Sequence, residues 1–117
     1  MFTISKRFAF SASHTLDSLP EGHKCRRLHG HNYLVEVVLQ AAALDEHGMV
    51  RDYGDLASFR EWLMATLDHR HLNDVIDQPT TAEVLAVYLH GQARAMLPVV
   101  VAVRVSETPD TWAEYRP

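Results

Sequence analysis

The chain has 117 residues, 47% of them hydrophobic, and a formal net charge of −4, so we expect one domain spanning residues 1–117 with a real core. The acidic balance argues against nucleic acid and anionic membranes as partners, and no apolar stretch approaches the roughly 18 residues of a membrane span. A single cysteine, and an N-terminus without the basic start and apolar run of a signal peptide, favour the reducing cytoplasm.

The first third of the chain predicts two strands joined by a polar loop. Apolar residues alternate from Phe2 and predict a strand that ends at His14, which shares its face with Phe8 and Phe10. Residues 17–27 are polar and contain Pro-Glu-Gly, so they predict a loop. A second strand is expected from about His29 to Ala42, with one face formed by His29, His31, Tyr33, Val35, Val37 and Leu39.

Two helices and two further strands are expected after a turn at residues 45–48. The first helix carries one apolar stripe, formed by Leu56, Phe59, Leu63 and Leu67. Thr80 as N-cap and Glu83 three residues later predict a capping box, followed by the stripe Leu85, Tyr88 or Leu89, and Met96. Pro98 ends this helix, residues 99–107 predict a third strand buried on both faces, and a short last strand runs through Trp112 and Tyr115. The order ββααββ predicts an α+β sheet with a helix pair on one face.

The His-Gly-His sequence at residues 29–31 is the first candidate for chemistry. Residues two apart in a strand project from the same face, so His29 and His31 can turn toward one point. His14 ends the first strand on a matching face and would supply a third ligand if the two strands form a hairpin. Three protein ligands with one open position are typical of catalytic zinc. The alternative is a plain pair of surface histidines.

Cys25 is the second candidate, because it lies in the polar loop among cations. Lys24, Arg26 and Arg27 are three of the eleven Lys and Arg residues in the chain, and neighbouring cations stabilise a thiolate. The alternative is an inert cysteine in a solvated basic loop. The cation cluster also fits an anionic substrate.

Two carboxylates complete the set of candidates. Asp68 can orient the adjacent His69 only if the backbone bends at the end of the first helix, and His71 is a weaker candidate for the same role. Glu107 follows a run of valines and shares the parity of Val99, Val101, Val103 and Val105. A carboxylate there either pairs with two N–H groups of an amidine-like heterocycle, such as a pterin or guanine edge, or emerges into solvent.

Taken together, these segments resemble a known family almost from end to end. The motifs FAFSASH, EGHKCRRLHGHNY, GMVRDYGDL, LDHRHLND, PTTAEV and SET are similar to those of the 6-pyruvoyl-tetrahydropterin synthase family, and Cys-x3-His-Gly-His resembles its 6-carboxy-tetrahydropterin synthase branch, which serves queuosine biosynthesis. The resemblance implies the tunnelling fold: a four-stranded antiparallel sheet with two helices inserted after the second strand. It also implies three sheets closing into a barrel and two such trimers stacking into a homohexamer.

The resemblance further implies a role for each candidate residue. The Zn²⁺ ligands would be His14, His29 and His31. Cys25 would be the catalytic thiolate, with Asp68 and His69 as proton-transfer partners reaching across from a neighbouring subunit. Glu107 would anchor the pterin ring, and Thr81 and Glu83 fall in the pterin-contacting segment. Pro79 to Glu83 is one residue longer than the commoner Pro-Thr-x-Glu of the family, so Glu83 is either a substrate contact or a helix cap.

The implied reaction is a lyase reaction on a pterin triphosphate. It converts 7,8-dihydroneopterin triphosphate to 6-carboxy-5,6,7,8-tetrahydropterin and releases acetaldehyde and triphosphate. We assign Lys24 and Arg27 to the triphosphate from charge alone. Two alternatives stay open: a 6-pyruvoyl-tetrahydropterin synthase-type enzyme, and a non-catalytic zinc- or pterin-binding protein.

Overall fold

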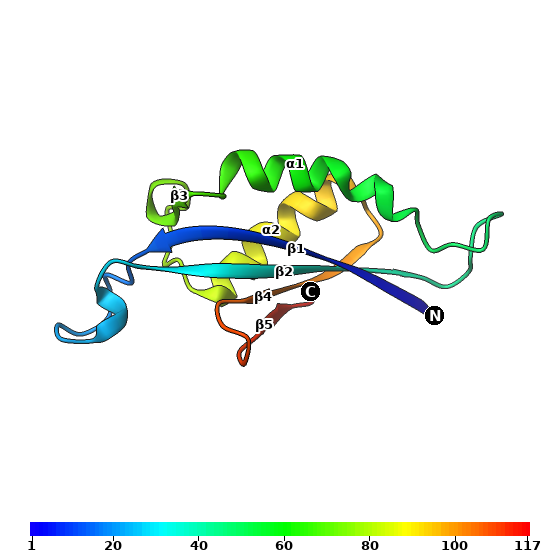
Figure 1. Cartoon of the computed structure of the whole chain (residues 1–117). Coiled ribbons are helices and arrows are strands. Elements are labelled where there is room, and N and C mark those ends of the chain that lie inside the picture. Colours follow the sequence, from blue (N-terminus) through cyan, green and yellow to red (C-terminus); the bar gives the residue numbers. More distant parts are fainter.

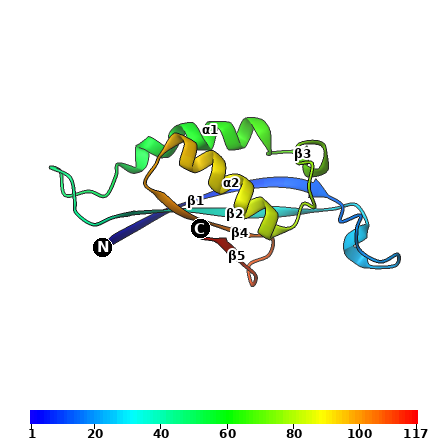
Figure 2. The same cartoon turned by 180° about the vertical axis from the view of Figure 1, so that it is seen from behind.

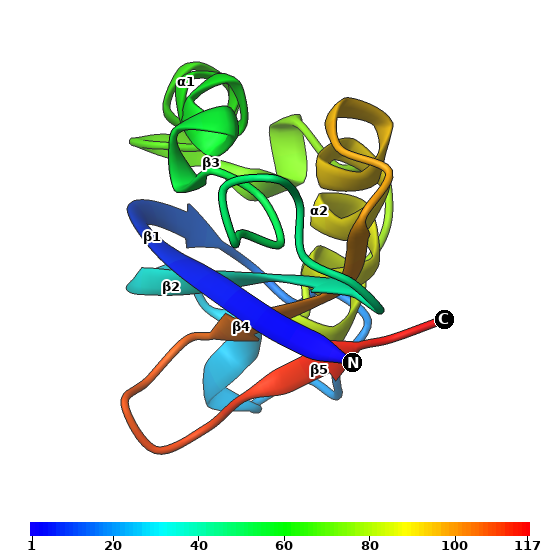
Figure 3. The ribbon, with the colours of Figure 1, turned by 90° about the vertical axis from the view of Figure 1, so that its right-hand side faces the viewer.

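The computed structural model describes all 117 residues as one mixed sheet with two helices on one of its faces (Figures 1 and 3). The strands are β1 (Phe2–His14), β2 (His29–Ala41), β3 (Arg70–His71), β4 (Val100–Ser106) and β5 (Ala113–Tyr115), in the spatial order β3-β1-β2-β4-β5. The helices are α1 (Ala57–Thr66) and α2 (Ala82–Met96). Neither helix has the length and apolarity that crossing a bilayer would require.

The core lies between the helix pair and the sheet face that the alternation predicted. The stripe of the first predicted helix is fully buried, and Phe59 from it packs edge-on against Phe8 of β1, with ring centroids 5.3 Å apart. On α2, Leu85 and Leu89 are buried, whereas Tyr88 and Met96 are half-buried at the edge of the core. Removing this apolar area from water is what fixes both helices on one face of the sheet.

The hairpin of β1 and β2 determines the shape of the molecule. Each of these strands has 13 residues, and they pair along their whole length. The molecule is therefore elongated, measuring 56 × 25 × 24 Å. The loop between the two strands, with a 3₁₀ turn at Lys24–Arg26, projects beyond one end of the sheet (Figures 1 and 2).

The sheet differs from the expected four-stranded antiparallel one, because a fifth strand pairs in parallel. Strand β3 pairs with Ala12 and Ser13 of β1. His69 takes a left-handed conformation with φ of 57°, and its N–H donates to the carbonyl oxygen of Ser11 at 2.6 Å, which turns the chain onto the strand edge. A two-residue strand carries no periodic pattern, so the sequence could not reveal it.

The start of α2 also differs from the expected capping box. The N-cap is Thr81, whose Oγ1 accepts the N–H of Val84 at 3.2 Å. Thr80 is completely buried instead and contacts His14. Glu83 is therefore the second residue of the helix and is one position short of where a capping box places its acidic residue.

A bulge interrupts the expected face of β4. The pairing of β4 with β2 shifts register between Val38 and Leu39. As a result, the valines of β4 that are completely buried are Val100, Val103 and Val105. Val99 and Val101 are only half-buried. Glu107 continues the face of Val103 and Val105, which brings its carboxylate toward β2.

Candidate metal centre and active site

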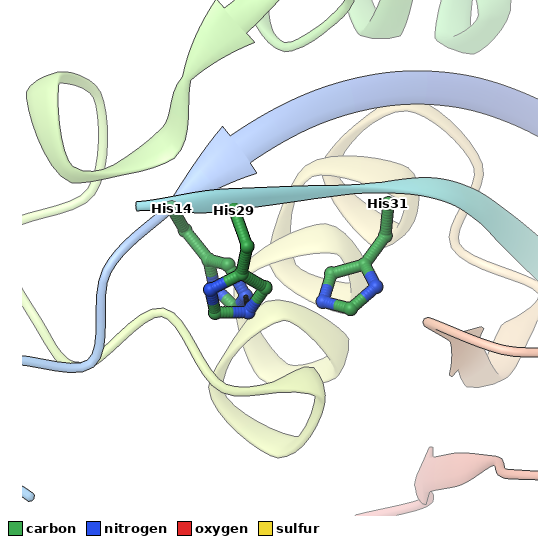
Figure 4. Close-up of side chains that lie close together, drawn as sticks. All are labelled: His14, His29 and His31. Atoms are coloured by element: carbon green, nitrogen blue, oxygen red, sulfur yellow. Dashed lines mark hydrogen bonds between the residues drawn. The ribbon is translucent and has the colours of Figure 1, made fainter. Parts of the chain in front are cut away.

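Three imidazoles converge where the long hairpin ends. The register places His14 opposite His29 and Ala12 opposite His31, and the period of two turns all three histidines to the helix-covered face. One ring nitrogen from each histidine lies within 4.8 Å of the other two. Figure 4 shows the three side chains on the same side of the hairpin. The predicted grouping of these residues is therefore present.

The backbone fixes which nitrogen of His14 and of His29 carries the proton. Nδ1 of His14 lies 2.8 Å from the carbonyl oxygen of Thr80, and Nδ1 of His29 lies 2.7 Å from that of Arg27. A carbonyl can only accept, so each Nδ1 donates. The two Nε2 atoms, 2.9 Å apart, then face each other with lone pairs, an arrangement that a cation between them would relieve. Donation of the second ring nitrogen to a carbonyl is the usual support of a metal-binding histidine.

His31 adds a third nitrogen that lacks a partner. Its Nε2 is buried without a hydrogen bond and lies 3.7 Å from Oε2 of Glu107. Burial lowers the pKa of both His14 and His31, which favours the neutral form that coordinates metals. Three imidazoles suit zinc in a site that keeps one position open, so the residues present fit the expected Zn²⁺ cofactor.

The imidazoles open into a hollow of about 490 Å³ that also contains the expected thiol. Cys25 is half-buried in its wall, and its N–H donates to Nδ1 of His23 at 3.1 Å. Glu107 and Lys24 line the same hollow, whereas Arg27 is exposed and does not. Arg26, which donates to the carbonyl oxygens of Asp17 and Leu19, fixes the shape of the loop.

Asp68 and His69 form a carboxylate–imidazole pair on a different part of the chain. Oδ2 of Asp68 accepts from Nδ1 of His69 at 2.8 Å, and Oδ1 accepts the N–H of Ser11 at 2.9 Å. These bonds, led by that of Ser11, lower the pKa of Asp68. The His69 side chain is 81% exposed, and it lines another hollow of about 480 Å³, which shares His31 with the hollow of Cys25 but does not include Cys25. His71 also lines that hollow, but its Nδ1 is held by Oγ of Ser13 at 2.9 Å.

Thr81 and Glu83 lie in a third hollow, of about 400 Å³, at the start of α2. This hollow adjoins the one with the imidazoles, since Leu16, Glu107 and Thr111 line both. Glu107 therefore stands between the histidines and the start of the helix. Of the two residues expected there, Thr81 already uses its hydroxyl as the helix cap, and Glu83 is exposed.

Two residues of the site are not indicated by the sequence patterns. The sequence predicts Thr80 as the helix cap, yet its carbonyl oxygen orients His14. Tyr33 is completely buried, with ring centroids 5.4 Å from His31 and 6.2 Å from His14. Burial raises the pKa of Tyr33, and the charge of Glu107 raises it further. Tyr33 lies on the same strand face as His29 and His31, and this pattern is the sequence signal that could have identified it.

This fold and this site have counterparts among known proteins. Residues 3–117 match the family described as 6-pyruvoyl tetrahydropterin synthase. A protein of Archaeoglobus fulgidus, provisionally named 6-carboxy-5,6,7,8-tetrahydropterin synthase, is 39% identical over 92% of this chain and 90% of its own length. The 6-carboxy-5,6,7,8-tetrahydropterin synthase of Synechocystis is 36% identical over 98% of this chain and 93% of its own. The solved structure of Caenorhabditis elegans 6-pyruvoyl tetrahydropterin synthase has a TM-score of 0.87 at 27% identity, covering 99% and 95% of the two chains.

These matches define an α+β pterin synthase. The chain belongs to the 6-pyruvoyl tetrahydropterin synthase family and is an enzyme of that family. The resemblance inferred from the sequence motifs is confirmed.

Proposed function

We propose that this enzyme is a zinc-dependent lyase of the queuosine pathway, which converts 7,8-dihydroneopterin triphosphate and one water molecule to 6-carboxy-5,6,7,8-tetrahydropterin, acetaldehyde and triphosphate. The observation that carries the proposal is the convergence of His14, His29 and His31 beside Cys25 in one hollow. The names of the Archaeoglobus and Synechocystis relatives support the carboxy product, as does the Cys-x3-His-Gly-His spacing.

Each residue of the hollow has a place in this chemistry. A zinc ion held by the three imidazoles would polarise oxygens of the substrate side chain and make adjacent C–H groups more acidic. Cys25, as the thiolate, accepts a proton from such a carbon, and His69, oriented by Asp68, supplies or accepts the balancing proton. Glu107 accepts from two N–H groups of the pterin ring, with Thr81 and Glu83 beside it. Lys24, at the hollow, and Arg27, in the same loop, are candidates for the triphosphate.

The proposal requires a second subunit. Within one chain, Cys25 and His69 line different hollows, so the proton-transfer pair has to come from a neighbouring copy. The outer edge of β1 pairs only at Ala12 and Ser13, and the rest of that long edge is available for pairing with another sheet. A homohexamer built from two trimeric barrels satisfies both conditions.

A 6-pyruvoyl-tetrahydropterin synthase activity is the second candidate. The similarity to the C. elegans enzyme of that name favours it, and the same imidazoles, thiol and carboxylate would serve. The two activities differ in product, because only the carboxy reaction releases acetaldehyde.

The deciding experiment incubates the zinc-loaded protein with 7,8-dihydroneopterin triphosphate and identifies the products by mass spectrometry. We expect acetaldehyde and 6-carboxy-tetrahydropterin in equal amounts. A pyruvoyl product without acetaldehyde would select the second candidate. Cys25→Ala should retain zinc and bind pterin but lose turnover, and normal turnover by this variant would exclude Cys25 as the base.

A further inference from the structure

Tyr33 carries a hydroxyl that the structure leaves without a partner beside the metal centre. Three buried side-chain polar atoms in the chain lack a hydrogen bond, and two of them, Nε2 of His31 and Oη of Tyr33, belong to neighbouring side chains of β2. A metal ion accounts for the first of these. It does not account for the second. A buried hydroxyl without a partner is costly to keep, so Oη of Tyr33 needs another explanation.

Packing alone does not explain why this residue is a tyrosine. Its ring stacks on Phe10, its cross-strand partner, with centroids 4.8 Å apart and planes 8° apart. Phe10 fills its side of this pair with a plain phenyl ring, and a phenyl ring at position 33 would make the same stack. The hydroxyl therefore requires a separate explanation.

The Glu107 carboxylate is an acceptor that lacks a donor. Its ion-pair partner is Nε2 of His31, at 3.7 Å, which is too long for a hydrogen bond. Once that nitrogen holds a metal ion it has no proton to donate. The side chain of Glu107 is only 26% exposed, and the pairing of Leu34 with Ser106 and of Val35 with Val105 brings Glu107 next to Tyr33. A half-buried carboxylate of this kind needs a protein donor to hold its orientation.

We propose that Tyr33 is a positioning residue whose hydroxyl donates to the Glu107 carboxylate when the site is loaded. This rests on the proposed function, in which Glu107 accepts from the pterin ring. One lone pair of the carboxylate is then occupied by Tyr33, and the other positions are aimed at the two N–H groups of the ring. The Tyr33 hydroxyl thus links the hollow lined by the imidazoles to recognition of the pterin ring.

The test measures binding of 7,8-dihydroneopterin, which has the ring but no triphosphate, to the zinc-loaded protein by isothermal titration calorimetry. The variants are Tyr33→Phe, Glu107→Ala and the double variant, with Tyr88→Phe, a half-buried tyrosine on α2, as control. Zinc per chain and the melting temperature of the metal-free protein are measured for each.

Tyr33→Phe should weaken ring binding by about tenfold, the usual effect of losing a hydrogen bond to a charged group. Its zinc content should be unchanged and its metal-free melting temperature equal or higher, because an unpaired hydroxyl has been removed. In the Glu107→Ala background the same change should alter binding by less than about twofold. Tyr88→Phe should behave as the wild type.

Three results would overturn the inference: wild-type binding by Tyr33→Phe, loss of zinc from it, or effects of Tyr33→Phe and Glu107→Ala that multiply. If the zinc-loaded wild type makes no pterin product from 7,8-dihydroneopterin triphosphate, the proposed function fails and this inference fails with it. If the wild type is active but binds no dihydroneopterin, only the inference fails. If the wild type binds and Tyr33→Phe binds equally well, only the inference fails.

Discussion

At the scale of single residues, Asp68 and His69, the proposed proton-transfer pair, lie at a strained position of the backbone. A left-handed backbone is rare for a residue other than glycine and costs about 1 kcal/mol or more. Here it is held at His69 by two hydrogen bonds with Ser11 of β1, whose carbonyl oxygen accepts from the N–H of His69 and whose own N–H donates to Asp68. The result is an exposed imidazole whose Nδ1 donates to a carboxylate, which leaves its Nε2 free for a substrate proton.

The first prediction separates His69 from His71. His69→Ala should lower kcat by at least about 100-fold with a smaller change in KM, the usual loss for a general acid or base. His71→Ala removes the bond to Ser13 and should mainly lower the melting temperature. Steady-state kinetics on both variants provide the check, and a greater loss of kcat in His71→Ala would reverse the assignment.

At the scale of elements, the hairpin positions the three proposed metal ligands, and Gly30 permits its close pairing. A Cβ at position 30 would lie 3.0 Å from the carbonyl oxygen of Ala12, a backbone atom. A side chain there would push β2 away from β1 between His29 and His31. The glycine of His-Gly-His is thus required by the approach of the two strands.

Gly30→Ala is therefore expected to lower the free energy of unfolding by about 1 to 2 kcal/mol and to weaken zinc binding by about tenfold. The control is Gly91→Ala on α2, where an added Cβ meets nothing within 4 Å. That change should stabilise the helix by about 0.5 to 1 kcal/mol and leave zinc binding unchanged. Urea unfolding and zinc titration measure both effects, and full zinc affinity in Gly30→Ala would contradict this account of the hairpin.

The opposite face of the sheet is held by a charge network across three strands. Glu36 of β2 accepts from Arg7 of β1 at 3.1 Å and from Arg104 of β4 at 3.0 Å. Burial alone would raise the pKa of Glu36, but the bonds from Arg104 and Arg7 outweigh it and hold the pKa below its ordinary value of 4.5. Such a carboxylate adds stability above its unfolded-state pKa and loses it as pH falls through the lower folded-state pKa.

Glu36→Gln should therefore be less stable than the wild type at pH 7 by about 1 to 2 kcal/mol, since two arginines lose their partner. The difference should start to shrink near pH 4.5 and disappear as pH falls below the folded-state pKa of Glu36. Glu46→Gln, an exposed change in the loop after β2, is the control. Urea unfolding across this pH range gives the measurement, and a difference that does not depend on pH would argue against the ion pairs.

The parts of this structure that could be predicted from the sequence are those set by periodicity. The alternation along β1 and β2 placed His14, His29 and His31 on one face, and the stripe of α1 placed Leu63 in the core. Features without a period could not be predicted: the two-residue β3, the bulge opposite Val38 and Leu39, and the burial of Thr80. Each depends on contacts between distant segments, such as the bond between Thr80 and His14, which no local pattern encodes.

At the scale of the whole molecule, the proposed active site is divided between two regions of the chain. Cys25 and the imidazoles lie at the end of the hairpin, whereas Asp68 and His69 lie at the β1 edge in another hollow. A complete site therefore requires two copies arranged so that the edge of one faces the hairpin end of the next. Closed cyclic symmetry would repeat this contact for every subunit.

This arrangement predicts complementation between inactive variants. Cys25→Ala and His69→Ala should each lack activity as pure oligomers. After mixed denaturation and refolding in equal amounts, about a quarter of the sites should combine an intact Cys25 with an intact His69 from a neighbour, and about a quarter of wild-type activity should return. Each variant refolded alone is the control, and absence of any recovered activity would place both residues in one subunit.

The central claim is that three imidazoles on one hairpin hold a zinc ion, and the most direct measurement is the metal content of freshly purified protein by mass spectrometry. We predict about one zinc per chain in the wild type and in His47→Ala, an exposed histidine at the far turn, and almost none in His29→Ala. Wild-type protein that contains no metal, and that gains neither bound zinc nor activity when zinc is added, would contradict the account.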